Sequence, residues 1–105
     1  MSTRCALYIQ TDDSTDWWQI YCHYDGNPEH MVPALKAADP KAILEAGELR
    51  GIGPDGTLNR FEDACRPKRL ATPEMPIWAS HAYILTYPGG WHHAMTDAQL
   101  LYRAG

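Results

Sequence analysis

The sequence has little of what marks several large classes of protein. No stretch approaches the roughly 20 consecutive apolar residues that span a bilayer, and the apolar run near Met1 is too short for a secretion signal. Its 3 cysteines form no CxxC pair, which argues against a disulfide framework, a zinc knuckle or a thioredoxin-type site. We therefore expect a cytoplasmic protein that has no cofactor and does not associate with a membrane.

Basic residues are also scarce. The chain has 9 Lys and Arg against 13 Asp and Glu, which gives a net charge of -4. Arg66, Lys68 and Arg69 make the one basic cluster, which we interpret as a solvated loop. Because binding to phosphates needs clustered basic residues, nucleic acid is not the expected partner. An acidic chain of this kind could bind a basic partner, or could itself mimic nucleic acid.

The length and the apolar content predict a single domain over residues 1–105. A chain of 105 residues with 45% hydrophobic residues can bury one modest core. The sequence shows no internal repeat, low-complexity tract or linker.

Alternating apolar and polar residues predict two hairpins. Residues 5–10 and 17–24 have strand patterns and flank the polar turn at residues 12–16. Residues 81–87 and 91–95 repeat this arrangement around Pro88-Gly89-Gly90.

Two helix starts follow the first hairpin. Asn27-Pro28-Glu29 and Asp39-Pro40 each combine a capping residue with a proline that suits the first helical position. Residues 50–78 are broken repeatedly by glycine and proline and receive no assignment, while residues 97–105 could add a short terminal helix. The resulting prediction is an α+β fold. It has an antiparallel sheet of about four strands, in two hairpins, with two short helices packed on one face.

One segment resembles a family of small phage and prophage proteins. The segment is Ile-Tyr-Cys-His-Tyr-Asp-Gly-Asn-Pro at residues 20–28, and it departs from the family pattern at Tyr24 and Asn27. Weaker matches are Ser2-Thr3-Arg4, Asp39-Pro40, the residues 44–49 and an aromatic hairpin near the end. The resemblance implies a phage or integrated-element origin, and it implies no reaction.

Tyr21, His23 and Asp25 form the candidate catalytic group. Residues two apart on a strand share a face, so these three side chains make a polar patch near the start of the first helix. In an enzyme, Asp25 would orient His23 as a general base. We favour the structural interpretation, in which Asp25 closes the turn.

Two further motifs are weighed in the same way. His81, His92 and His93 lie on neighbouring strands of the second hairpin and could approach a zinc or nickel ion, although we favour a half-exposed sheet face that tolerates histidine. Residues 51–56 match GxGxxG, but Pro54 removes one amide donor, and we interpret the segment as a turn.

Aromatic residues exceed what a small core needs. The chain has 4 Trp and 6 Tyr, and exposed rings are typical of interface anchors. The predicted binding residues lie on the second strand of the first hairpin, directly after it and on the last strand: Trp17, Tyr21, His23, Tyr24, Asp25 and Trp91.

These features favour a non-enzymatic accessory protein of phage or prophage that binds a host or phage macromolecule. A protein is the expected partner, and a bacterial defence complex that the chain inhibits is one form of it. The alternative is a small hydrolase or metal-dependent enzyme centred on Tyr21, His23 and Asp25. A third hypothesis is a homo-oligomer that forms through an unpaired strand edge.

Overall fold

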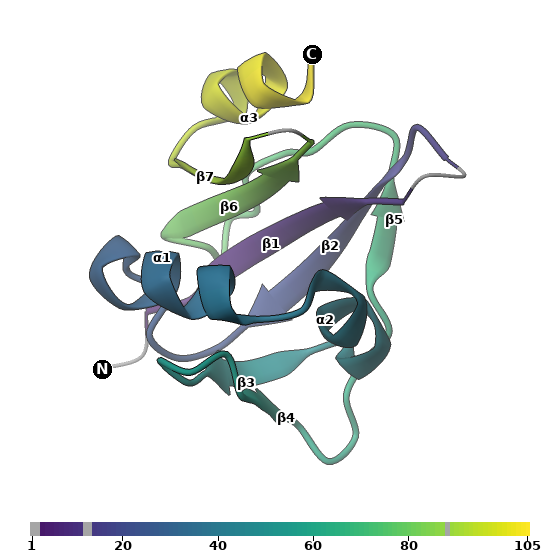
Figure 1. Cartoon of the computed structure of the whole chain (residues 1–105). Coiled ribbons are helices and arrows are strands. Elements are labelled where there is room, and N and C mark those ends of the chain that lie inside the picture. Colours follow the sequence, from purple (N-terminus) through teal and green to yellow (C-terminus); the bar gives the residue numbers. More distant parts are fainter. Residues whose placement is uncertain (1–2, 12–13, 88) are drawn as a thin grey trace.

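The computed structural model describes residues 3–11, 14–87 and 89–105. Figure 1 shows its strands and helices: β1 (Cys5–Gln10), β2 (Trp17–Cys22), α1 (Pro28–Ala37), α2 (Pro40–Ala46), β3 (Leu49–Ile52), β4 (Leu58–Arg60), β5 (Lys68–Leu70), β6 (His81–Thr86), β7 (Gly90–Ala94) and α3 (Asp97–Ala104). Ser2, Asp12, Asp13 and Pro88, which the sequence patterns above include, lie outside the described residues. None of the described helices is both long and apolar enough to cross a bilayer.

The strands form one mixed sheet. Its order is β4-β3-β2-β1-β6-β7, and β5 also pairs with β2. Both predicted hairpins are present, since β1 pairs antiparallel with β2 and β6 antiparallel with β7. However, β1 runs parallel to β6, and β2 runs parallel to β3. The prediction of a four-stranded antiparallel sheet was therefore wrong.

The three strands that sequence reasoning missed are short. β3 has 4 residues, and β4 and β5 have 3 each. Such lengths are too small to show an alternating pattern, so only pairing with an existing neighbour identifies them. The GxGxxG segment spans the end of β3 and its turn to β4, where the Gly53 N–H donates to the Thr57 carbonyl at 2.8 Å. A strand follows this turn instead of the helix that a dinucleotide site requires.

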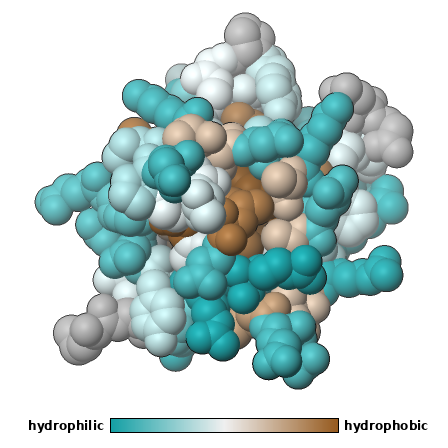
Figure 2. Space-filling view, turned by 60° about the horizontal axis from the view of Figure 1, so that its bottom comes forward, coloured by the Kyte–Doolittle hydropathy of each residue, from teal (hydrophilic) through white to brown (hydrophobic). Residues whose placement is uncertain are grey.

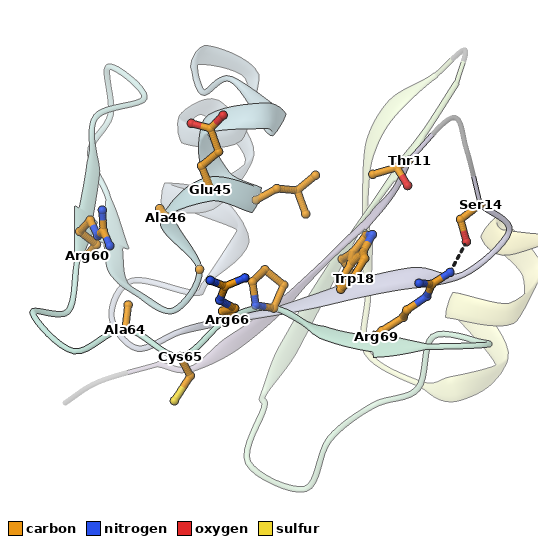
Figure 3. Close-up of a pocket in the computed structure, with 13 residues that line it drawn as sticks. Thr11, Ser14, Trp18, Glu45, Ala46, Arg60, Ala64, Cys65, Arg66 and Arg69 are labelled. Atoms are coloured by element: carbon orange, nitrogen blue, oxygen red, sulfur yellow. Dashed lines mark hydrogen bonds between the residues drawn. The ribbon is translucent and has the colours of Figure 1, made fainter.

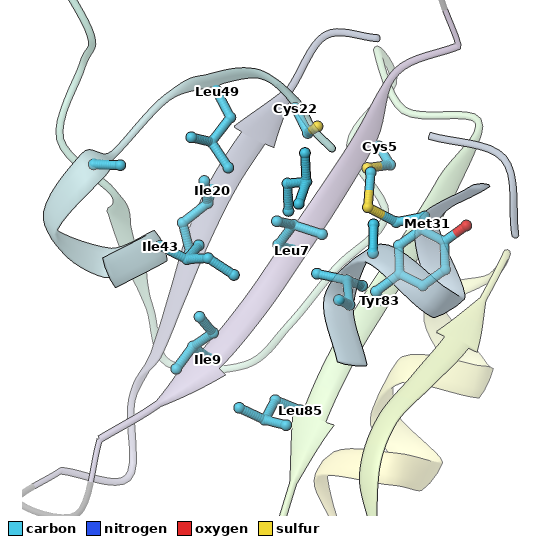
Figure 4. Packing of buried hydrophobic residues seen from close by; sticks show 14 residues of the cluster. Cys5, Leu7, Ile9, Ile20, Cys22, Met31, Ile43, Leu49, Tyr83 and Leu85 are labelled. Carbon is cyan, nitrogen blue, oxygen red and sulfur yellow. The ribbon is translucent and has the colours of Figure 1, made fainter. Parts of the chain in front are cut away.

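Helices α1 and α2 cover one side of the sheet, here called the helix face. Alternate residues of β1, such as Leu7 and Ile9, point to this face and pack with Leu35 of α1 and Ile43 of α2. Figure 4 shows this main cluster between the central strands and the two helices. Packing against the helices orients the strands that carry the candidate site.

The predicted terminal helix lies on the other side of the sheet, here called the opposite face. Leu100 of α3 is fully buried in a second cluster with Tyr8 and Ile84, whose side chains point away from α1 and α2. The connection from β5 to β6 adds Met75 and Trp78 to this face. The helices therefore do not all pack on one face, because both faces of the central strands are apolar and both need covering.

Candidate functional site

The chain bends sharply where β2 ends. The N–H groups of His23 and Tyr24 donate to carbonyls of β3, at 3.0 Å and 2.7 Å, so the strand continues beside β3 for two more residues. Asp25 then has a φ of 57°, a left-handed conformation that Asp tolerates better than most residues. The Gly26 N–H donates to the Thr3 carbonyl at 2.8 Å, and the Gly26 carbonyl accepts from the Tyr83 hydroxyl at 2.6 Å. These bonds fix the bend as part of the fold.

Rings from three segments meet beside this bend. The Tyr21 ring lies 4.9 Å from the Trp78 ring and 6.4 Å from the Phe61 ring, measured between centroids. The His23 ring lies 4.4 Å from Tyr24 and 6.0 Å from Phe61. We call these five residues, Tyr21, His23, Tyr24, Phe61 and Trp78, the aromatic corner.

The aromatic corner is a surface feature. Tyr24 is 48% exposed, and the other four residues are half-buried. The Arg50 guanidinium lies 5.1 Å from the Phe61 ring centre and adds a positive charge to the corner. Because the rings already contact one another, each keeps its position before any partner binds.

His23 is bonded to Tyr21 and not to Asp25. The Tyr21 hydroxyl and the His23 Nδ1 are 2.5 Å apart. Burial raises the pKa of Tyr21, so its hydroxyl keeps its proton and can donate it to Nδ1. Asp25 is exposed and makes no hydrogen bond to His23. Of the three side chains named for catalysis, Tyr21 and His23 thus form a pair. Asp25 does not orient the imidazole.

Two predicted binding residues lie elsewhere. Trp17 is only 5% exposed and belongs to the second core cluster, and Trp91 packs half-buried against the main cluster. Sequence reasoning did not assign Phe61 or Trp78 to a site. Phe61 is the only phenylalanine of the sequence, and it stands among polar residues in the middle segment that received no assignment. This isolated apolar ring was the one feature of the sequence that could have pointed to a site there.

The three histidines of the second hairpin are divided between the faces. His81 Nδ1 of β6 and His93 Nε2 of β7 are 2.8 Å apart, and His93 is also the cross-strand neighbour of Tyr83. His92 points the other way, and its Nε2 lies 2.8 Å from the Thr86 hydroxyl. Among the described residues, no three His, Cys, Asp or Glu side chains are grouped as a metal site would need.

Comparison with known proteins gives no relative. The chain matches no protein family, no curated protein and no solved structure. The resemblance to small phage proteins at residues 20–28 therefore stays a prediction.

Proposed function

We propose that this protein binds another protein through its aromatic corner. The observation that carries the proposal is the contact of five rings at the surface, beside a bend that backbone hydrogen bonds hold in place. Tyrosine and tryptophan are enriched among the residues that dominate protein interfaces, since they bury a large area and lose few rotamers.

The charges around the corner support a protein partner over a nucleic acid. Arg50, Arg66 and Lys68 border it, but so do the carboxylates of Glu48 and Asp25, and the whole chain carries a net charge of -4. A mixed border of this kind does not neutralise a phosphate backbone. A phage origin, and inhibition of a host defence complex, rest on the sequence resemblance alone.

Photo-crosslinking tests the proposal. A photoreactive phenylalanine analogue replaces Tyr24 at the corner or, as the control, Tyr102 on α3, which is 79% exposed. After irradiation in a lysate of the cells that make the protein, the Tyr24 position should give one dominant cross-linked band. The Tyr102 position should not give that band.

A competition arm adds specificity. Purified wild-type chain in excess should suppress the Tyr24 band, and excess Trp78→Ala chain should suppress it about tenfold less, as expected when an interface anchor is lost. Equal bands from both positions, or suppression by the Trp78→Ala chain as strong as by wild type, would contradict docking at the corner. Circular dichroism of the Trp78→Ala chain checks that it is folded.

A further inference from the structure

A large pocket opens on the helix face, on the other side of the sheet from Tyr21. It has a volume of about 800 Å³ and lies between α2, β2 and the segment that joins β4 to β5. Figure 3 shows α2 and the residues 60–66 on one side of this space and Trp18 with Arg69 on the other. We call it the arginine pocket, after Arg60, Arg66 and Arg69 in its wall.

The pocket exists because the neighbour of β2 changes along its length. β5 pairs with the first residues of β2, up to Gln19, and β3 pairs with its last residue, Cys22. Residues 65–67 cross the gap between them and are anchored where the Glu48 N–H donates to the Cys65 carbonyl at 3.0 Å. Gly47 allows this approach, since a Cβ at that position would lie 2.4 Å from the same carbonyl oxygen.

Positive charge is concentrated at this pocket. It takes three of the six arginines in a chain whose net charge is -4, and Glu45 is the one carboxylate among the described residues of its wall. Arg60 and Arg66 are exposed and form no ion pair with any described residue. Guanidinium groups that are not neutralised attract carboxylates and phosphates, to which they can donate two parallel hydrogen bonds.

Arg69 is held in position before any ligand binds. Its Nε donates to Asp16 at 2.6 Å and its Nη2 to the Ser14 hydroxyl at 3.0 Å, and its guanidinium lies 5.5 Å from the centre of the Trp18 ring. The bond to Asp16 is an ion pair, so Arg69 adds positioned N–H donors to the wall and less net charge than Arg60 and Arg66 do.

Part of the remaining wall is apolar. Trp18, Leu44, Ala46 and Pro67 line the pocket beside the arginines. Figure 2 views the molecule from the end that carries β3 and β4 and shows hydrophobic residues at the centre of that face, with hydrophilic side chains around them. The Cys65 sulfur points away from Trp18 and the α2 side chains (Figure 3).

We infer that the arginine pocket binds a small organic anion, in which a carboxylate or a phosphate monoester is attached to an apolar group. The anionic end meets Arg60 and Arg66, and the apolar end meets Trp18 and Leu44. The volume suits a ligand of this class, because small-molecule pockets span about 300–1,000 Å³. This inference goes beyond the proposed function, whose rings lie on the opposite side of the sheet, although Arg66 also lines the hollow beside Tyr21 and Trp78.

Isothermal titration calorimetry of the full chain tests the inference at low ionic strength. The probes are phenyl phosphate, phenylacetate, inorganic phosphate and benzyl alcohol. At least one of the two ring anions should saturate a single site and bind more tightly than inorganic phosphate, while benzyl alcohol should give no saturation. The tighter of the two ring anions identifies the preferred head group.

Matched variants locate the site. Arg66→Ala and Arg60→Ala should each weaken the ring anion about tenfold, the loss expected for a charged hydrogen bond. Arg103→Ala removes an equal charge from exposed α3 and should leave the affinity within about twofold. In NMR spectra, the ring anion should shift the indole N–H signal of Trp18 more than those of the other three tryptophans.

Several outcomes would overturn the inference. These are the absence of saturation by either ring anion, equal affinity for inorganic phosphate, equal losses in Arg66→Ala and Arg103→Ala, or no preferential shift of Trp18. The NMR measurement uses the wild-type chain, so it decides the question even if an arginine variant fails to fold.

Discussion

Gly26 stands where the bend after β2 passes the beginning of β1, and no side chain fits there. A Cβ at this position would lie 2.7 Å from the Thr3 carbonyl oxygen, a backbone atom that accepts from the Gly26 N–H, and 2.9 Å from the Cβ of Cys5 in β1. We expect Gly26→Ala to lower the free energy of unfolding by about 1–3 kcal/mol, as overpacking does. Urea denaturation followed by circular dichroism measures this change.

Gly51→Ala is the matched control for this prediction. A Cβ at Gly51 would meet its nearest neighbour at 3.6 Å, an ordinary contact. The control should change the free energy of unfolding by less than about 0.5 kcal/mol. Equal effects of the two substitutions would show that Gly26 is not sterically constrained.

His93 makes stability depend on pH. Burial and the neighbouring His81 lower the pKa of His93 in the folded protein below its ordinary value of 6.5. The unfolded chain therefore binds a proton at a higher pH than the folded chain, and stability falls as pH drops below about 6.5. Burial lowers the pKa of His92 as well, so its contribution has the same sign.

We expect the melting temperature to fall when the pH is lowered from about 7.5 to about 5.5, which is about one unit either side of the ordinary histidine pKa. It should fall less in His93→Gln, because glutamine cannot take up the proton. Differential scanning fluorimetry at the two pH values measures the difference. A variant with the same pH dependence as wild type would exclude His93 as its source.

At the scale of elements, α3 is held to the sheet by one side of its surface. Leu100 is fully buried against the second cluster, whereas the adjacent Leu101 is 50% exposed. Leu100→Ala should therefore lower the free energy of unfolding by about 2–5 kcal/mol, the range for a leucine removed from a core. Leu101→Ala should change it by less than about 0.5 kcal/mol.

Chemical denaturation of the two leucine variants checks this prediction. Both changes remove the same atoms from the same helix, so any difference in helix propensity cancels. Similar losses of stability in both variants would mean that α3 does not pack through Leu100.

The candidate site also depends on short elements. Phe61 follows the 3-residue strand β4, and Trp78 lies in the connection that follows the 3-residue strand β5. Neither strand has a pattern that can be recognised without its pairing partner, and so the aromatic corner could be predicted only in the part that belongs to β2 and the bend. That part was Tyr21, His23 and Tyr24.

At the scale of the whole molecule, burial separates the three thiols. Cys5 and Cys22 are cross-strand partners that are both fully buried, and Cys65 is exposed. A hydrogen bond with Cys22 and, after it, burial raise the pKa of the Cys5 thiol, which reduces its reactivity further.

We expect Ellman's reagent to modify one thiol in the folded protein and all three in denaturant. In Cys65→Ser, the folded protein should give no rapid reaction. Rapid modification of two or more thiols in the native protein would show that the β1–β2 pair is not closed over Cys5 and Cys22.

The sequence by itself determined the local structure. The alternation in residues 5–10 and 17–22 determined which side chains share a face, because side chains on a strand alternate. Asp39 caps α2 as expected, since its side chain accepts from the Lys41 N–H at 3.1 Å, and Gly47 ends that helix with a φ of 74°. These features depend only on neighbours along the chain.

Tertiary structure alone decided the order of the strands and the two sites. The parallel pairing of β1 with β6 joins residues that are more than 70 positions apart, and no local pattern encodes such a pairing. The same holds for the contact of Tyr21 with Trp78 and for the placement of Arg66 and Trp18 in one pocket, because each depends on where the chain returns after a long connection. Burial of apolar surface on both faces of the sheet selects that return path, and it acts on the whole chain at once.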